Sequence, residues 1–367
     1  MQDYLHAYPI VYLIFVIVFS LFLTVLAIPS ILHVARERHL YDDLGSFRKH
    51  HDHGIPRLGG IGIFVSFTIT SLLFGFADKS LPINYLLTAC IILFAMGMKD
   101  DLTGVNSVTK FFMQFIVASI LVILGDIRIT SMYGVFGIYD LPYFFSVPLS
   151  TLIIMLIVNA FNLIDGIDGL ASVTCIIVNA TFAALFVYIK HYELAAVAFA
   201  MVGATAGFLH FNLSPAKIFM GDTGSLLMGL ISAVMALKFI ELNKYPGPHS
   251  PQIFCAPAIT FAILIGPIFD TLRVFIIRIA KGDSPFSADR NHMHHRILTL
   301  GFSHIQTTII LASLNMICIG IVVMFSSIGN STLIIMITFI SIMFNWLITF
   351  LIRSKERENM ALRNLFA

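Results

Sequence analysis

The sequence predicts an all-α polytopic membrane protein, and three observations support that prediction. Of the 367 residues, 58% are hydrophobic and only 11% are charged, and the mean hydropathy is +0.92. Soluble domains rarely reach such values. Long apolar runs recur along the chain, and basic residues gather in alternate segments between them. We therefore treat residues 1–367 as a single integral membrane domain.

Eleven apolar runs are at or near the roughly 20 residues that a transmembrane helix needs. They lie at residues 9–32, 58–77, 83–98, 110–125, 146–164, 170–189, 193–211, 224–241, 252–280, 307–325 and 332–352, with the third and fourth short. No Lys or Arg precedes Arg36, and no small-residue cleavage site ends the first run. We interpret it as a transmembrane helix rather than a signal peptide.

The basic residues orient these helices. If the N-terminus lies outside, the inner segments hold seventeen of the 22 Lys and Arg residues and the outer segments hold five. The positive-inside rule therefore predicts an outer N-terminus and a cytoplasmic C-terminus. The same orientation puts four polar motifs on the inner face. These are KDDL (99–102), NLIDGIDGL (162–170), FMGDTGS (219–225) and DRNHMHH (289–295).

Taken singly, the aspartates of these motifs have ordinary interpretations. Asp-Gly pairs form turns, and Asp222 before Thr223 could cap a helix. Taken together, they favour a site. Asp165 and Asp168 would share one face of a helical turn, and clustered carboxylates repel each other unless a cation joins them. Oxygen ligands with few histidines favour Mg²⁺ or Mn²⁺ over zinc, and phosphates of a substrate often complete a Mg²⁺ site. The pattern thus indicates phosphoryl transfer.

The histidine motif leaves three interpretations open. His292, His294 and His295 beside Arg290 could bind anions, could hold zinc, or could lie in a solvated loop without a function. All of the polar motifs fall at the ends of apolar runs, at headgroup depth. A site there can reach a lipid phosphate from one side and a soluble nucleotide from the other. The net charge of +2 is too small to indicate nucleic-acid binding.

Several ordered motifs carry a family resemblance that covers nearly the whole chain. They are IPRLGG (55–60), the aspartate pair 100–101, SVTKFF (107–112), NAFNLIDGIDGL (159–170), FNLSPAKIFMGDTGS (211–225) and SPFSADRNHMHH (284–295). At this spacing they closely resemble the polyprenyl-phosphate N-acetylhexosamine-1-phosphate transferases. The resemblance implies transfer of N-acetylhexosamine 1-phosphate, with N-acetylglucosamine favoured, from a UDP-sugar to undecaprenyl phosphate, with release of UMP.

The resemblance also implies the setting of the reaction. It implies Mg²⁺ as cofactor, with Mn²⁺ as a substitute, and an active site on the cytoplasmic face of the bacterial inner membrane. The product would initiate a lipid-linked cell-envelope glycan, such as the O-antigen of lipopolysaccharide. The partners would be the two substrates and the lipid bilayer, and a homodimer is compatible with the family.

The family's reacting groups map onto the acidic motifs. By matching position, Asp222 resembles the metal ligand, and Asp101 is expected to assist it. Asp100 resembles the group that deprotonates or orients the lipid phosphate, and Lys110 resembles a residue that contacts phosphate. The lysine that the muramoyl-pentapeptide enzymes carry ahead of Gly-Gly is not matched by position, although Arg57 lies nearby.

The remaining matches concern the nucleotide and the sugar. The resemblance implies that Asn162, Asp165 and Asp168 contact the nucleotide. It implies that Asn212 and Phe219 form a uridine pocket, with Phe219 stacking on uracil. His292, His294 and His295 with Arg290 resemble a histidine loop near the diphosphate and sugar. Muramoyl-pentapeptide enzymes have three consecutive histidines, whereas this chain has H-x-H-H. The sequence therefore favours the acetylglucosamine or teichoic-acid branch, with the pentapeptide enzyme as an alternative.

The ninth apolar run is expected to be a broken helix. Residues 252–280 are longer than a bilayer requires and contain Gly266-Pro267. We expect the second half to bend at headgroup depth and help form a groove for the polyprenyl chain, with Arg273 or Arg278 near its phosphate. The alternative is a long tilted helix whose arginines snorkel.

A secondary transporter or flippase of a glycan pathway is the rival class of protein. Transporters place ionisable or unwound segments near the middle of the membrane, often in paired repeats. Here the middles of the apolar runs carry almost no charge, and the two halves of the chain do not match. The sequence therefore favours the enzyme.

Overall fold

The computed structural model describes residues 8–40, 54–75, 81–244, 251–282 and 291–365. Within these ranges the chain is almost entirely helical, which confirms the predicted fold class. The helices are α2 (Pro9–Glu37), α3 (Gly59–Phe74), α4 (Ile83–Thr103), α5 (Ser107–Ser119), continued by the π-helical turn η1 (Ile120–Leu124), α6 (Tyr143–Ile164), α7 (Leu170–Tyr188), α8 (Tyr192–Asn212), α9 (Gly221–Lys244), α10 (Ala256–Lys281), α11 (Met293–Thr299), α12 (His304–Met324) and α13 (Asn330–Leu365), with a short 3₁₀ turn at Ser326–Ile328.

Each of the eleven predicted runs coincides with a helix, and ten helices in the described ranges are long and apolar enough to cross a membrane. Among the helices of these runs the shortest is α3, with 16 residues, because α5 and η1 together form an 18-residue helix. The third and fourth runs were expected to be the short ones. The helix of the fourth run starts before the run itself, at Ser107. The Asn106 side chain caps it there by accepting hydrogen bonds from the Val108 and Thr109 nitrogens. A small antiparallel hairpin, β1 (Ser131–Val135) and β2 (Ile138–Asp140), precedes α6.

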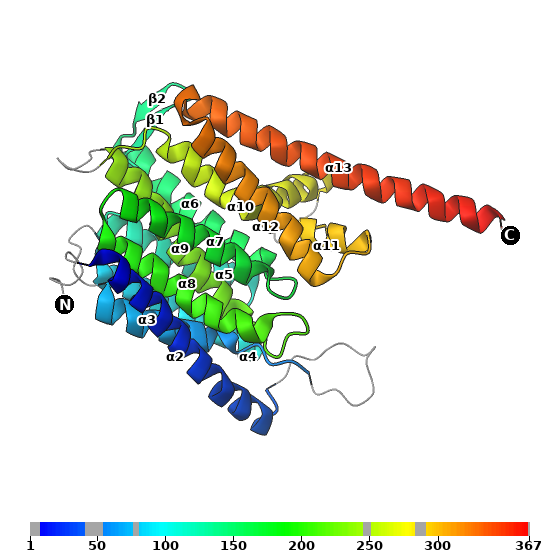
Figure 1. Cartoon of the computed structure of the whole chain (residues 1–367), viewed down its shortest axis with the longest axis horizontal. Helices are drawn as coiled ribbons and strands as arrows, with labels where there is room; N and C mark the ends of the chain where they lie inside the picture. Colours follow the sequence, from blue (N-terminus) through cyan, green and yellow to red (C-terminus); the bar gives the residue numbers. More distant parts are fainter. Residues whose placement is uncertain (1–7, 41–53, 76–80, 245–250, 283–290, 366–367) are drawn as a thin grey trace.

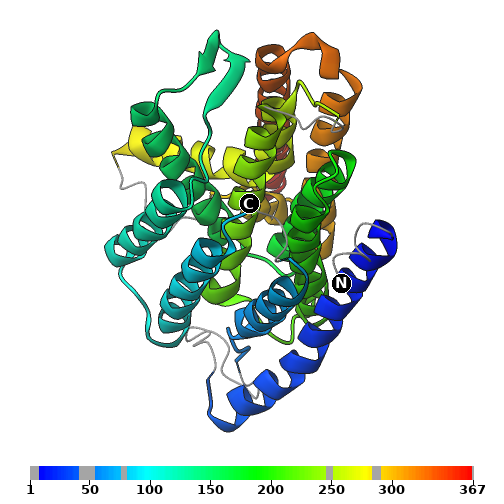
Figure 2. The ribbon, with the colours of Figure 1, turned by 90° about the vertical axis from the view of Figure 1, so that its left-hand side faces the viewer.

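Helix α9 lies at the centre of the bundle (Figures 1 and 2). In its most apolar 18-residue stretch, 89% of the residues are buried. Its first turn is packed against glycines of two other helices. A Cβ at Gly60 of α3 would lie 2.2 Å from the Gly224 nitrogen, and a Cβ at Gly97 of α4 would lie 2.7 Å from the Thr223 Cα. These two glycines let three helices meet backbone to backbone at one end of the bundle.

Helix α10 does not break into two helices, so that part of the sequence prediction is corrected. It is one continuous helix from Ala256 to Lys281 with Pro267 inside it. Its last turns, in yellow in Figure 2, nevertheless run across the direction of the central helices. The proline changes the direction of the helix without ending it.

The ends of the described chain lie at opposite ends of the bundle, as an odd number of crossings requires. Helix α2 starts near the hairpin end, and the C-terminal part of α13 projects beyond the other helices on the far side (Figure 1). The aspartate-bearing starts and ends of α4, α6 and α9 are at this second end. The helix count and the placement of the acidic motifs therefore agree with the topology expected from sequence.

We expect Gly60→Ala to destabilise the bundle by about 1–3 kcal/mol, because the added methyl meets backbone atoms that cannot move aside independently. The measurement is the thermal midpoint of the full chain in detergent. Gly320→Ala is the matched control, since a Cβ at Gly320 of α12 meets nothing within 4 Å. Equal midpoints for the two variants would contradict the account of close packing at α9.

Candidate active site

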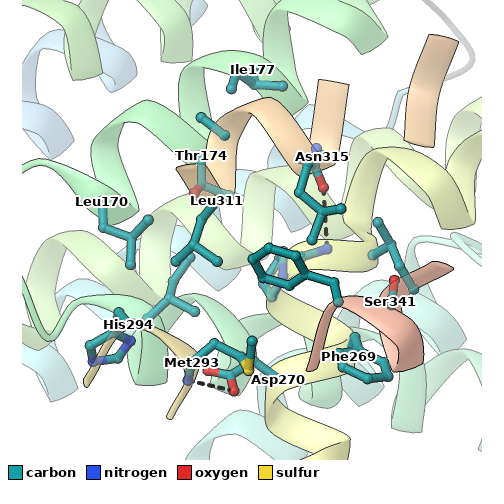
Figure 3. Close-up of a pocket in the computed structure, with 17 residues that line it drawn as sticks. Leu170, Thr174, Ile177, Phe269, Asp270, Met293, His294, Leu311, Asn315 and Ser341 are labelled. Carbon is teal, nitrogen blue, oxygen red and sulfur yellow. Dashed lines mark hydrogen bonds between the residues drawn. The ribbon is translucent and has the colours of Figure 1, made fainter. Parts of the chain in front are cut away.

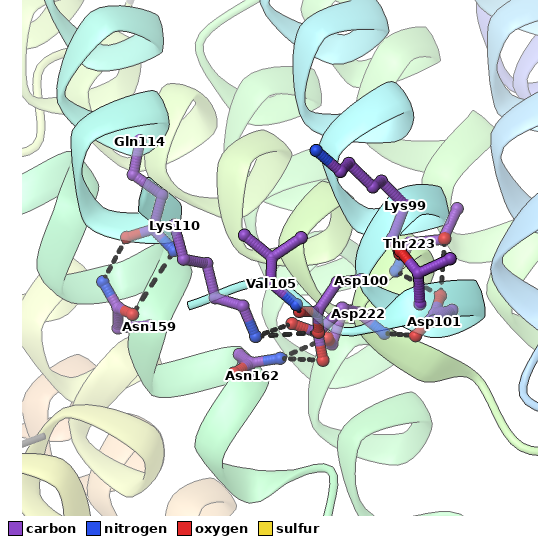
Figure 4. A network of polar contacts seen from close by, with 12 residues as sticks. Lys99, Asp100, Asp101, Val105, Lys110, Gln114, Asn159, Asn162, Asp222 and Thr223 are labelled. Carbon is purple, nitrogen blue, oxygen red and sulfur yellow. Dashed lines mark hydrogen bonds and ion pairs between the residues drawn. The ribbon is translucent and has the colours of Figure 1, made fainter. Parts of the chain in front are cut away.

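A lysine and two aspartates from three helices form the centre of the site (Figure 4). The Lys110 Nζ of α5 lies 2.9 Å from Asp100 Oδ2 of α4 and 2.5 Å from Asp222 Oδ2 of α9. The other oxygen of Asp222 accepts from the Asn162 Nδ2 of α6 at 3.0 Å. The structure thus brings together four residues that the sequence singled out, although 122 positions separate the first from the last.

Asp101 has a different position from its neighbour Asp100. Its Oδ1 accepts from the Asp222 nitrogen at 2.7 Å, and its Oδ2 accepts from the Thr223 nitrogen at 3.0 Å and from the Thr223 hydroxyl at 2.6 Å. It therefore caps the start of α9 from another helix, where a carboxylate is favoured by unpaired N–H groups and by the helix dipole. Asp101 holds Asp222 in place.

The three carboxylates could also share a cation. One oxygen from each of Asp100, Asp101 and Asp222 lies within 4.8 Å of the others, which is the one such acidic group in the described part of the chain. The Lys110 ammonium lies against two of these three carboxylates. All the donors are hard oxygens, which suit Mg²⁺ or Mn²⁺ rather than zinc.

A pocket of about 430 Å³ opens beside this centre, within the roughly 300–1,000 Å³ that is usual for small-molecule sites. Seven residues that the sequence singled out line it, namely Asp101, Asn162, Asp165, Asp168, Asn212, Phe219 and Asp222. Arg57 and His304 line it as well. His304 carries no motif signature, and the histidine at the start of an apolar run was the only signal that could have pointed to it.

The surroundings of Asp165 strongly shift the pKa of its carboxyl group. Its pKa is raised well above the ordinary value, first by burial and then by the charges of Asp222 and Asp101, while Arg57 acts in the opposite direction. Asp168, three residues later, lies 3.3 Å from the His304 Nδ1. Burial and the neighbouring carboxylates thus both disfavour the charged form of Asp165, which a cation nearby would stabilise.

Asn212 and Phe219 are held mainly through backbone contacts. Asn212 Oδ1 accepts from the Gly169 nitrogen at 2.9 Å, and its Nδ2 donates to the Ile218 carbonyl at 3.0 Å, so the buried amide joins two loops. Phe219 forms backbone hydrogen bonds with Pro56 and Gly59, and its half-buried ring lines the pocket. The amide of Asn212 thus holds the pocket wall, whereas the ring of Phe219 is available to a ligand.

The histidine motif is anchored by an aspartate of α10. Asp270 is 4% exposed, and it lies 3.0 Å from the His292 Nδ1, accepts from the Met293 nitrogen at 2.9 Å and accepts from Arg273 at 3.1 Å. Arg273 also donates to the Asn291 carbonyl. The guanidinium of Arg273 is thus engaged in holding the histidine segment, which does not favour the phosphate contact expected for it. Arg278 is buried, at 3% exposure, and Arg290 lies outside the described residues.

His294 and His295 sit differently on α11. His294 is buried against the NLIDGIDGL segment, because a Cβ at Gly166 would lie 2.3 Å from its Nε2. Neither of its ring nitrogens has a hydrogen-bond partner in the described structure. Burial and the neighbouring His295 lower the pKa of His294 to about 3, so its imidazole is neutral at physiological pH. His295 is only partly buried. The histidine helix therefore meets the aspartate pocket at Gly166.

Asn315 of α12 is a polar residue that sequence reasoning missed. Pro267 has no N–H, which leaves the carbonyl of Ile263 without its helical donor. The Asn315 Nδ2 donates to that carbonyl at 3.1 Å. Its Oδ1 accepts from the Gly266 nitrogen at 3.2 Å, as Figure 3 shows. One amide thus satisfies both backbone groups at the proline, three residues before Asp270. A lone asparagine inside an apolar run was the available signal.

Comparisons with known proteins identify the family of this chain. The sequence model of glycosyl transferase family 4 matches residues 83–240. A probable undecaprenyl-phosphate N-acetylglucosaminyl 1-phosphate transferase of Bacillus subtilis is 32% identical over 270 residues, which cover 73% of each chain. The undecaprenyl-phosphate alpha-N-acetylglucosaminyl 1-phosphate transferase of Escherichia coli K12 is 29% identical over 292 residues, 77% of each chain. The decaprenyl-phosphate N-acetylglucosaminephosphotransferase of Mycobacterium tuberculosis H37Rv is 31% identical over 278 residues, covering 70% of this chain and 68% of the relative.

Fold, site and comparisons define a class of protein, an integral membrane phosphoglycosyl transferase. Within that class, the chain belongs to glycosyl transferase family 4, together with the polyprenyl-phosphate N-acetylglucosamine-1-phosphate transferases that it matches. The family resemblance stated from sequence is confirmed, and so is the enzyme, which sets aside the transporter as the rival class.

We expect Asn315→Leu to reduce turnover about tenfold or more while leaving nucleotide affinity nearly unchanged. The leucine leaves the buried Ile263 carbonyl unpaired, at about 1–3 kcal/mol, and removes the Asn315 acceptor of the Gly266 nitrogen, so the helix shifts and Asp270 and the histidines move with it. Phe219 lies in the segment before α9, which neither hydrogen bond of Asn315 reaches. The measurement is kcat and the donor KM in the same preparation.

The matched control is Ser313→Leu, an exposed position of the same helix that has no hydrogen bond with α10 in the described structure. It should retain wild-type turnover. A uniform loss of nucleotide affinity and kcat in Asn315→Leu, or full activity in that variant, would remove the positioning role.

Proposed function

We propose that this chain transfers N-acetylglucosamine 1-phosphate from its UDP-sugar to undecaprenyl phosphate and releases UMP. The single observation that supports the proposal best is the convergence of Asp100, Lys110 and Asp222 beside a pocket walled by Asp165 and Phe219. Phosphoryl transfer needs positioned carboxylates, a cation and a nucleotide pocket at one place. The sugar is inferred from the relatives, whose names specify N-acetylglucosamine.

The proposed reaction exchanges one phosphoanhydride bond for another. An oxygen of the lipid phosphate attacks the phosphorus that bears the sugar, the bond to the bridging oxygen of the donor breaks, and UMP leaves with that oxygen and its electron pair. The Lys110 ammonium neutralises charge on the reacting phosphates, and Asp100, held by Lys110, orients the lipid phosphate or accepts its proton.

The residues present fit a magnesium ion. Asp222 is the proposed principal ligand and Asp101 an assisting one, although both oxygens of Asp101 already accept hydrogen bonds from the start of α9. When bound, the ion would neutralise the charge of the donor diphosphate. The raised pKa of Asp165 supports the proposal, since an additional cation would offset the excess of carboxylates around it.

The proposed setting is the bacterial inner membrane, with the active site facing the cytoplasm. Seventeen of the 22 basic residues fall on the side that carries the acidic motifs, and this bias is typical of the cytoplasmic face. A UDP-sugar is a cytoplasmic metabolite class that could reach a pocket open at that face, while the lipid phosphate approaches from the bilayer.

The experiment combines purified full-length protein, undecaprenyl phosphate, Mg²⁺ and radiolabelled UDP-sugars. We expect equal amounts of UMP and labelled lipid with UDP-N-acetylglucosamine, little product with UDP-N-acetylgalactosamine or UDP-N-acetylmuramoyl-pentapeptide, and no turnover with EDTA until Mg²⁺ or Mn²⁺ is restored. Label transfer from the pentapeptide donor alone, or activity that persists in EDTA, would contradict the proposed donor or the proposed metal.

Asp222→Asn should lower turnover by more than tenfold, which corresponds to about 1.4 kcal/mol of barrier. The amide retains the size of the side chain and can still accept from Asn162, but it loses the charge that faces Lys110 and the metal. Lys99→Gln is the control, because Lys99 lies on α4 beside the site but points away from the carboxylates (Figure 4). Asp222→Asn with more than a tenth of the wild-type rate would end the metal role.

Phe219→Ala should weaken UMP binding, since stacking of a base on an aromatic ring is worth about 1–3 kcal/mol. Titration calorimetry with UMP measures the effect, and Phe219→Tyr should retain the affinity because it keeps the ring. An alanine variant that is folded and binds UMP as tightly as wild type would show that the ring only packs at the pocket entrance.

A further inference from the structure

A second pocket, of about 470 Å³, lies between α11 and the far end of α13, and the proposed reaction does not use it. Its charged lining residues are Arg296, Arg353, Lys355 and Glu356. Three basic side chains against one acid give the lining a net positive charge. The pocket is thus built to receive an anion.

Arg296 has the strongest need for an anionic partner. Its guanidinium donates to the Thr349 hydroxyl at 2.6 Å and to the Asn345 side chain, both on α13. These partners are neutral, and no carboxylate pairs with Arg296 within the described ranges. Burial, followed by the nearby charge of Arg273, lowers its pKa, while the charge of Asp270 acts in the opposite direction. A partly buried charge without a directly paired carboxylate is costly, so an anion bound to it would stabilise the protein.

The other two basic residues complete the cradle from α13. Lys355 donates to the carbonyls of Thr299 at 3.1 Å and Leu300 at 2.9 Å, which fixes it against the end of α11. Arg353 is exposed and makes no hydrogen bond or ion pair with any residue that the structure describes. One basic group is therefore fixed and one is free to close on a ligand.

The depth of the pocket indicates the class of ligand. The apolar run of α13 ends at about residue 352, so the pocket lies where hydrocarbon gives way to headgroups. Trp346 lies two turns and Phe350 about one turn from Arg353 toward the membrane. Their rings are stacked with centroids 6.0 Å apart and are 60% and 57% exposed. Trp346 precedes Thr349 by three residues and Arg353 by seven, which puts the three on one face. An apolar surface thus continues directly from the basic pocket.

We propose that this pocket binds the phosphate headgroup of an anionic phospholipid of the same leaflet, with its acyl chains along Trp346 and Phe350. Basic pockets between transmembrane helices on the cytoplasmic side bind such headgroups. The bound lipid supplies a directly paired anion for Arg296 and ties α13 to α11, the helix that carries His294 and His295. The binding does not depend on the proposed reaction and can be measured without it.

The single tryptophan of the chain provides the measurement. Trp346 lies about 10 Å along the helix from Arg353, at 1.5 Å per residue, so bromine atoms on the acyl chains of a bound lipid would quench its fluorescence. The full-length protein is reconstituted into vesicles with equal fractions of brominated phosphatidylglycerol or brominated phosphatidylcholine. We expect an apparent preference for phosphatidylglycerol of about tenfold or more from the charged groups of the pocket.

Three variants make the test specific. Arg353→Gln should reduce the preference while disturbing no hydrogen bond within the described structure, and Arg353→Gln with Lys355→Gln should abolish it. Arg38→Gln, a charge removed from the exposed end of α2, is the matched control and should retain it. A thermal melt of each variant shows whether the bundle is intact.

Two sources of phosphate are separated in the same vesicles. Inorganic phosphate, added at constant ionic strength, should leave the lipid preference unchanged. Equal quenching by the two brominated lipids in wild type, a preference that survives in the double variant, or a preference that inorganic phosphate removes would each overturn the proposal.

Discussion

The active centre depends on the capping of α9 by Asp101. Both carboxylate oxygens of Asp101 are engaged by the first N–H groups and the threonine hydroxyl of that helix, which are groups that an uncapped helix would leave unpaired. Since Asp222 belongs to the same turn, the cap also fixes the carboxylate that faces Lys110. The glycines at positions 60 and 97 allow this turn to be reached by α3 and α4 without side chains in between. One carboxylate, through three hydrogen bonds, thus links helix packing to the geometry of the active centre.

The sequence was sufficient for the elements and for the identity of the motifs. Hydropathy located the eleven long apolar helices, although not the short α11, because lipid requires an uninterrupted apolar run. The motif order identified the family. The sequence could not show which partners the adjacent Asp100 and Asp101 have. Asp100 accepts from Lys110 whereas Asp101 caps α9, and this difference depends on which side of α4 faces each neighbour. The same limit applies to Arg273. A spacing of three residues on a helix allows its ion pair with Asp270, but its hydrogen bond to the histidine segment depends on the tertiary fold.

The bend of α10 shows why a proline in the sequence does not by itself predict whether a helix ends or only changes direction. A proline removes one hydrogen bond and can end a helix or only redirect it. Here Asn315 of another helix pairs with both backbone groups at the proline, which lets the helix continue through the bend. The direction of the last turns then sets where Asp270 lies, and Asp270 anchors His292. An outcome decided by a residue 48 positions away from the proline could not be read from the local pattern.

The histidine helix differs from the aspartate centre in how it is supported. The aspartates are fixed within the bundle, by a cap and by close glycine contacts. By contrast, α11 is short and rests on side chains from α10 and α13, through Asp270 on one side and through Asn345, Thr349 and Lys355 on the other. Such a helix owes little of its stability to its own seven residues. Its position therefore follows from the two helices that hold it, and a change in either of them alters the distance between His294 and the pocket wall at Gly166 without touching the carboxylates.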